Sequence, residues 1–184
     1  AKIIDGLQTI ISRELQLTNE AAVITVGQLH SGVRNNIIPE KATLIGTIRT
    51  LDSEMQDIIH AKIRKTVTAI AEAGGATVDI DLKKGIPVTV NNPDLTRKML
   101  PTLYDIAGEE NVLLSRATTG AEDFSFYANK IPSLFVFLGG MPEGQSPIDA
   151  APHHTPDFFI DDSGLKLGVK AYARLALDYQ NKHN

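Results

Sequence analysis

AAVITVGQLHSGVRNNIIPEKATLIGTIRT, residues 21–50, places two strand-like runs on either side of a loop rich in Gly, Asn and Pro. In the second run, Leu44 and Ile48 share one face of the expected strand, while Thr47 and Arg49 lie on the other, because successive side chains of a strand alternate. Arg49 is therefore expected to point away from the core. Loops as long as the one between the runs are often functional.

Amphipathic helices are expected on both sides of these strands. Apolar residues from Ile3 to Leu15 recur at helical spacing, and a second such stripe runs from Ile59 to Ile70. Residues 76–83 alternate strictly between apolar and polar side chains, which predicts a third strand. Alternating strands are typical of an antiparallel sheet that helices cover on one face only. The pattern predicts a small open-faced α+β sandwich over residues 1–85.

The pattern changes after residue 93. A helix is expected at about 94–106, and LFVFL at 134–138 is a continuous apolar run, which predicts a strand buried on both faces, as in a parallel α/β sheet. A last helix is expected at 164–179. Residues 91–184 offer only one other weak strand, so this second part is expected to be incomplete. Because the chain also lacks an initiator methionine, we expect it to begin inside a longer protein.

Composition excludes several classes of partner. The formal charge of −4, with dispersed Lys and Arg, gives no basic patch for nucleic acid. No apolar run approaches the roughly 20 residues that span a bilayer, so no membrane partner is expected. The chain has no cysteine, and any metal must bind nitrogen and oxygen ligands. The compartment stays unknown: a cytoplasmic location is favoured, and an exported form stays open because the N-terminus of the whole protein is expected to be missing.

Two adjacent histidines stand between prolines in APHHTPDFFIDD, residues 151–162. Histidine is a common ligand of zinc-like metals. Ala151 and Thr155 each precede a proline, which favours extended backbone, so His153 and His154 should point to opposite sides and only one can reach a given metal. A zinc site needs three or four ligands, which the chain does not clearly supply. A polar loop without a metal remains the alternative.

A second candidate is GAEDF, residues 120–124. Gly120 precedes a helix start, where a glycine lets a backbone amide approach a ligand closely. Glu122 and Asp123 are either functional or simply complement the helix dipole, and the second interpretation is favoured.

Together these segments resemble one family, the M20 metallopeptidases and amidohydrolases, in its aminoacylase, hippurate hydrolase and auxin-conjugate hydrolase branch. NIIP and GTIRT resemble the NxIP and GTxRT motifs of that family's lid or dimerisation domain, GAEDFSFY its GGEDFxxY segment, and HHTP the region of its last metal-binding histidine. The resemblance implies an α+β lid, an antiparallel sheet with two helices on one face, over residues 1–88 and lacking its first strand. Residues 89–184 would then be the C-terminal part of an α/β catalytic domain.

The resemblance also assigns residues. His154 matches the family's C-terminal metal ligand, and Asn36, the first residue of NIIP, matches a lid asparagine that reaches substrate, often in the partner subunit. Arg49 matches an arginine near the substrate, and Gly120 a glycine whose backbone contacts the bound acyl amino acid. No catalytic residue is expected in this chain, since the glutamate general base would lie in the missing N-terminal half.

The function implied is a metal-dependent amidohydrolase. With two Zn (or Mn or Co) ions per full-length chain, it would cleave the amide bond of N-acyl amino acids or related conjugates and peptides with a metal-activated water. It would be a homodimer through the lid, and this fragment alone would be inactive, with no metal bound. Gly85-Ile86-Pro87 departs from the G-R-P segment of the glutamate-specific carboxypeptidase members, which favours the aminoacylase-like branch. The alternative is a non-catalytic dimerisation or small-molecule-binding module.

Overall fold

The computed structural model describes residues 1–18, 20–146 and 148–181, and it divides into two compact units. Unit 1 comprises Ala1–Val88 and Arg116–Ser125; unit 2 comprises Thr89–Ser115 and the described residues from Phe126 onward. The last three residues of the predicted catalytic segment lie outside the described residues. The segment 116–125, which the sequence places in the catalytic part, lies with unit 1. The assignment of a lid and a catalytic domain stays a prediction.

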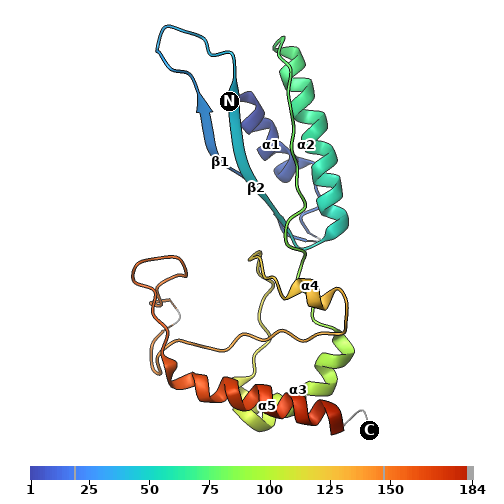
Figure 1. The fold of residues 1–184 in the computed structure, drawn as a ribbon, viewed down its shortest axis with the longest axis vertical. Coiled ribbons are helices and arrows are strands. Elements are labelled where there is room, and N and C mark those ends of the chain that lie inside the picture. The colour runs from blue at the N-terminus through green and yellow to red at the C-terminus, as the bar shows by residue number, and fades with distance from the viewer. Residues whose placement is uncertain (19, 147, 182–184) are drawn as a thin grey trace. The chain divides into compact units, whose positions relative to one another are not determined.

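Unit 1 is built on a two-stranded antiparallel sheet of β1 (Ala22–Ser31) and β2 (Ala42–Thr50), shown in Figure 1. Val23 lies opposite Arg49 in the register, and a bulge between Val26 and Gln28 leaves Gly27 unpaired. Arg49 is on the exposed face, as the alternation predicts.

Helices α1 (Lys2–Arg13) and α2 (Ser53–Ala73) pack on the other face of the sheet (Figure 1). Asp52 begins α2, and its side chain accepts a hydrogen bond from the Met55 amide, which satisfies a free donor of the first turn. The core between the helices and the sheet consists of buried apolar side chains from both layers: Leu7, Ile10, Ala22, Ile24, Met55, Ile59, Ile63 and Val67. Unit 1 is thus an α+β layer with one open sheet face.

Gly46 of β2 leaves no room for a side chain beside the backbone of β1. A Cβ atom on Gly46 would lie 2.1 Å from the carbonyl oxygen of Thr25, whereas a Cβ on Gly27 would meet no atom within 4 Å. The glycine of the GTIRT segment therefore has a packing role in the sheet.

The prediction of a third strand at residues 76–83 is wrong. This segment pairs with no strand among the residues that the structure describes, although Ile80 and Leu82 still pack against the core. Its alternating side chains can be buried without a ladder, but strand backbone needs a neighbouring strand to pair with. Arg64 of α2 instead donates a hydrogen bond to the Ile80 carbonyl at 3.0 Å.

Unit 2 contains two long helices that pack together, α3 (Pro93–Ala107) and α5 (Leu165–Asn181). Thr102 donates a hydrogen bond at 2.8 Å to the Asp178 carboxylate across their contact. Shorter helical turns lie between them along the chain: η1 (Glu109–Asn111), α4 (Ser125–Ala128), whose first residue belongs to unit 1, and η2 (Asp162–Gly164).

The predicted buried strand at 134–138 is also wrong. These residues form no strand within the described part of the chain, and Phe137 is 70% exposed. The Asn91 side chain, and not a neighbouring strand, pairs with the backbone of Phe135, by contacts of 2.9 and 2.7 Å. The α/β sheet expected from this run is therefore not formed by residues 1–18, 20–146 and 148–181.

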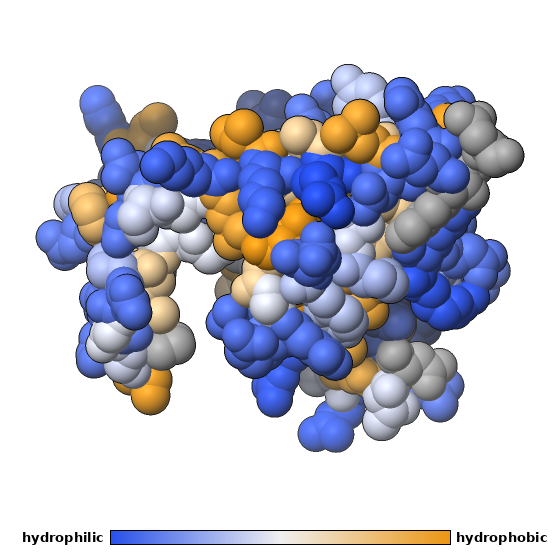
Figure 2. Space-filling view, turned by 90° about the horizontal axis from the view of Figure 1, so that it is seen from below, coloured by the Kyte–Doolittle hydropathy of each residue, from blue (hydrophilic) through white to orange (hydrophobic). Residues whose placement is uncertain are grey.

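Unit 2 leaves much apolar surface uncovered. The last helix, α5, buries none of its described residues, and Val169 and Tyr172 are among its most exposed side chains. Apolar surface is visible between hydrophilic side chains in the space-filling view (Figure 2). Since these apolar side chains are exposed, unit 2 has a smaller core than its sequence could supply. Burial of apolar area is the main stabilising term of a fold, so this unit gains less of that stabilisation.

Candidate functional site

Three of the four predicted site residues belong to unit 1, and two of them are brought together. Arg49, on the exposed face of β2, donates a hydrogen bond from Nη1 to the carbonyl oxygen of Thr119 at 2.9 Å. Thr119 directly precedes Gly120, and 70 positions separate it from Arg49 in the sequence. The GTIRT and GAEDF segments therefore meet at the outer face of the sheet.

Gly120 itself is open to solvent. A Cβ added to it would have Thr118 Oγ1 as its nearest neighbour, at 4.0 Å. Its amide donates to no carbonyl or side chain of the described residues. A contact between this amide and a ligand stays a prediction.

Asn36 lies in the exposed turn of the loop between β1 and β2. The turn is closed by a hydrogen bond of 3.4 Å from the Ile37 amide to the Arg34 carbonyl, and the side chain of Ile38 is 95% exposed. No hydrogen bond joins Asn36 to Arg49 or Gly120 in the described part of unit 1.

The paired histidines form a turn, and the predicted extended conformation is wrong there. His154 has φ 65°, the only positive φ of a non-glycine residue in the described chain, and the Thr155 hydroxyl closes the turn on the Pro152 carbonyl at 2.7 Å. A proline restricts the backbone of the residue before it, which here is Ala151 or Thr155 and neither histidine. His153 and His154 are therefore free to form a turn. The His153 ring packs against Phe158 with centroids 4.6 Å apart, and both histidines are exposed.

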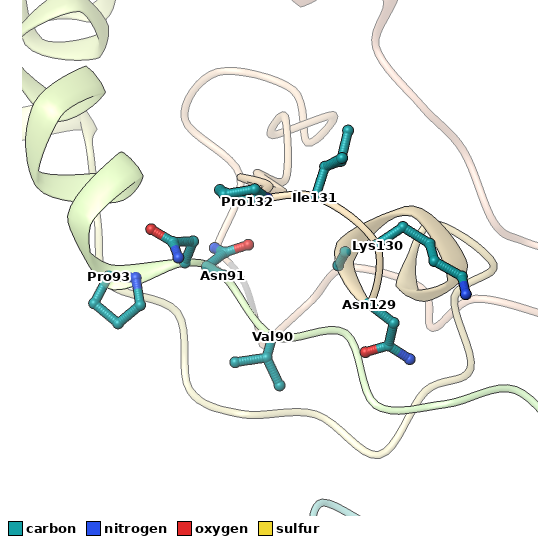
Figure 3. A pocket seen from close by; sticks show the side chains of 9 residues that line it. Val90, Asn91, Pro93, Asn129, Lys130, Ile131 and Pro132 are labelled. Atoms are coloured by element: carbon teal, nitrogen blue, oxygen red, sulfur yellow. The ribbon is translucent and has the colours of Figure 1, made fainter.

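Two hollows open on unit 2. The smaller, about 370 Å³, lies beside the start of α3 and is lined by Val90, Asn91, Pro93, Lys130 and others (Figure 3). The side-chain amide of Asn91 is already engaged with the backbone of Phe135, whereas Asn129 and Lys130 also line the hollow.

The larger hollow, about 840 Å³, is formed by the segment from Leu138 to Leu165. His153 lines it, and His154 does not. Asp157 and Asp161 line it too, and a backbone hydrogen bond from Ser163 lowers the pKa of Asp161, since it favours the charged carboxylate. Sequence reasoning missed this concave surface, because it depends on how one long loop folds back on itself.

No group of three potential ligands among His, Asp and Glu is assembled in residues 1–18, 20–146 and 148–181. The described residues therefore do not complete a metal site, and His154 as a metal ligand stays a prediction. Within the same residues, no helix is long and apolar enough to cross a membrane.

Comparison with known proteins decides the family. The sequence profile of peptidase family M20/M25/M40 matches residues 4–178. The chain belongs to this family. Thermostable carboxypeptidase 2 of Saccharolobus solfataricus is 34% identical over 182 residues, covering 98% of this chain and 45% of that protein. N-acetyldiaminopimelate deacetylase of Streptococcus sanguinis is 35% identical over 179 residues, covering 96% of this chain and 45% of that protein.

The fold of this M20 chain is also found in a solved structure. The YXEP protein of Bacillus subtilis, described as a dinuclear metal-binding peptidase of the M20 family, superposes with a TM-score of 0.71 at 26% identity, covering 95% of this chain and 43% of that chain. The M20 chain thus spans less than half the length of the relatives that it matches.

Proposed function

We propose that these 184 residues are the lid and the C-terminal part of a longer metal-dependent amidohydrolase, which cleaves the amide bond of N-acyl amino acids or related conjugates and peptides. The observation that carries the proposal is the family match over residues 4–178. The names of the relatives, carboxypeptidase and deacetylase, support hydrolysis of an amide bond next to an amino acid. The departure at Gly85-Ile86-Pro87 favours the acyl amino acid over a glutamyl peptide.

His154 is the proposed metal ligand in this chain. Its imidazole is exposed and free of ring stacking on Phe158, whereas His153 is held against that ring. Neutral imidazole suits Zn, Mn and Co, and the absence of cysteine leaves only nitrogen and oxygen donors. When bound, such a metal pair would supply a water of lowered pKa and a polarised carbonyl. The remaining ligands and the general base belong to residues outside this chain.

The lid residues have a proposed role in binding. Asn36 is placed on an exposed turn, where a loop can reach a substrate in its own or a partner's active site. Gly120 offers a free amide donor, and Arg49 lies next to it. We propose a homodimer formed through residues 1–88, so that Asn36 serves the partner's site.

The proposal is tested on the 184-residue chain beside the complete gene product that contains it. Metal content is measured by elemental mass spectrometry, and hydrolysis is assayed against a panel of N-acyl amino acids. We expect about two metal ions per chain and turnover only in the complete gene product, with the 184-residue chain inactive.

His154→Ala and His153→Ala form a matched pair in the complete gene product. His154→Ala should lose metal and at least about 100-fold in kcat/KM, because losing a ligand costs no less than losing the groups that orient it. His153→Ala should keep both metal content and turnover within about threefold, since its ring packs on Phe158. The opposite order of the two variants would move the ligand to His153. A complete, folded gene product that hydrolyses nothing would favour the binding module.

A further inference from the structure

The larger hollow of unit 2 combines apolar walls with unpaired acidic side chains. Its volume is about 840 Å³, and the segment from Leu138 to Leu165 forms it. We propose that this hollow binds an organic cation, a molecule with an apolar stem that ends in a primary ammonium group. If the proposed function holds, this group is the side chain of a basic N-acyl amino acid. That identity rests on the proposed function, whereas the binding itself does not.

Close backbone contacts give the hollow its shape. The Asp161 amide donates a hydrogen bond of 2.8 Å to the Gly140 carbonyl, which joins the two ends of the segment that forms the walls. A Cβ on Gly140 would lie 2.9 Å from Cγ2 of Ile160. One on Gly164 would lie 3.2 Å from the carbonyl oxygen of Gly139. The ends of the segment are therefore in contact, and the loop between them surrounds a space that its own side chains leave open.

The walls suit an apolar stem. Exposed apolar side chains line the hollow, among them Met141, Phe158 and Leu165. The Phe158 ring is held in place by the His153 ring, with centroids 4.6 Å apart. Each methylene group that a ligand buries against such side chains raises its affinity by up to about fourfold. The hollow therefore favours a ligand with several methylene groups.

Charge complementarity selects a cation. Three carboxylates line the hollow, those of Asp149, Asp157 and Asp161, and none of its described lining residues is Lys or Arg. In the described part of the chain, no ion pair includes any of the three. A positively charged ligand therefore gains an attraction that no basic side chain already uses, whereas an anion is repelled.

The chemistry of the lining favours an ammonium group over a metal ion. Within residues 1–18, 20–146 and 148–181, no group of three His, Asp or Glu side chains could hold a metal ion. Apolar walls also offer a metal ion no nitrogen or oxygen ligands. An ammonium group, in contrast, is attracted both by a carboxylate and by the face of an aromatic ring such as Phe158.

The hollow lies beside the proposed metal ligand. His153 lines the hollow, and the ring centroids of His153 and His154 are 6.5 Å apart. A substrate held at His154 therefore has the hollow within reach of a long side chain. This position links the cation site to the choice of substrate.

The first experiment uses the 184-residue chain and three probes that share a hexyl-length stem: n-hexylammonium, hexan-1-ol and hexanoate. Binding is followed by ¹H–¹⁵N NMR at Gly139, Gly140 and Gly164, which line the hollow, with Gly85 and Gly120 of unit 1 as references. Hexylammonium should shift the lining glycines and leave the references in place. It should bind at least about fivefold more tightly than hexanol, and hexanoate should bind most weakly. The reverse order, or no shift at the lining glycines, would overturn the proposal.

Asp157→Asn and Asp162→Asn form a matched pair. Each removes one negative charge from the same region, but Asp162 does not line the hollow. Asp157→Asn should weaken hexylammonium binding about two- to fivefold, the range for one exposed ion pair, and Asp162→Asn by less than about 1.5-fold. Equal losses would show an effect of net charge alone and would count against the site.

The length of the stem tests the apolar walls. n-Butylammonium should bind about tenfold more weakly than n-hexylammonium, because two buried methylene groups are missing. Equal affinities of the two amines would show that the walls do not hold the stem.

The second experiment uses the complete gene product that contains this chain. Hexylammonium binding is measured there by saturation-transfer NMR, and Asp157→Asn should reduce it. Absent binding would show that residues outside this chain fill the hollow, which would overturn the proposal.

The substrate is tested by kcat/KM for Nα-acetyl-L-lysine and N-acetyl-L-norleucine, which differ by the terminal amine. The ratio should favour the lysine compound and should fall about two- to fivefold in Asp157→Asn. A preference for norleucine would overturn the assignment of the hollow to a basic side chain. Hydrolysis of neither compound would count against the proposed function, while the binding of hexylammonium is decided by NMR without turnover.

Discussion

Substituting Gly46 by alanine tests the packing of the two-stranded sheet of unit 1. The added Cβ would lie 2.1 Å from the Thr25 carbonyl oxygen, more than 1 Å inside ordinary carbon–oxygen contacts of about 3.3 Å. Because the opposing atom is backbone, β1 itself must move. Overpacking costs about 1–3 kcal/mol, and weakening one or two ladder hydrogen bonds adds about 1 kcal/mol. We expect a loss of about 2–4 kcal/mol in the free energy of unfolding of unit 1.

The matched control is Gly27→Ala, one position from the residue opposite Gly46. A Cβ there meets nothing within 4 Å, so this variant should be neutral or more stable by about 0.4–1 kcal/mol, through the lower entropy of its unfolded chain.

Urea unfolding distinguishes the two variants. All four tyrosines of the chain lie in unit 2, so tyrosine fluorescence follows that unit, while hydrogen exchange of peptides from β2 follows unit 1. Gly46→Ala should lower the midpoint for unit 1 by about 1–2 M and leave the fluorescence transition unchanged. Equal midpoints for Gly46→Ala and Gly27→Ala would refute the steric argument.

Three further predictions concern α2 and its N-cap. Ile59 is fully buried, so Ile59→Ala should lower the free energy of unfolding, measured in urea, by about 2–5 kcal/mol. Ile58 is 50% exposed, and Ile58→Ala should lower it by less than about 1 kcal/mol. Similar losses in the two variants would contradict the assignment of Ile59 to the core. Asp52→Ala removes the cap on the Met55 amide and should cost about 1 kcal/mol by the same measurement, with Asp52→Asn retaining most of it. Burial lowers the pKa of His60, so as the pH falls the unfolded chain takes up a proton on this side chain before the folded chain does. The free energy of unfolding should therefore fall as the pH drops below about 6.5, and it should fall less steeply in His60→Gln. Identical pH profiles of the two proteins would show that His60 is not desolvated.

The helices were predictable because each satisfies its own backbone hydrogen bonds. The spacing of Ile59, Ile63 and Val67 predicts α2, and all three side chains are buried in the structure. The strand pair 22–50 was predictable too, since its two runs are close in sequence and one connection joins them. The strands expected at 76–83 and 134–138 failed for the opposite reason: a strand needs a partner, and alternation or a run of apolar residues does not supply one.

The candidate site shows the same contrast between features that the local sequence predicts and features that it does not. Sequence motifs named Asn36, Arg49, Gly120 and His154 as candidates, since a motif records residue type and spacing. The positive φ of His154 and the packing of its neighbour against Phe158 were not predictable, because two prolines restrict only the residues that precede them.

By itself, the sequence determined the family, the helical stripes, the antiparallel strand pair and the exposure of Arg49, all of which follow from local periodicity and short motifs. Only the tertiary structure decided that Arg49 meets the carbonyl of Thr119, that Gly46 must lack a side chain, and that the histidines form a turn. These features depend on atoms that are distant in sequence or on backbone angles that no residue pattern fixes, so they are set when the elements pack against one another.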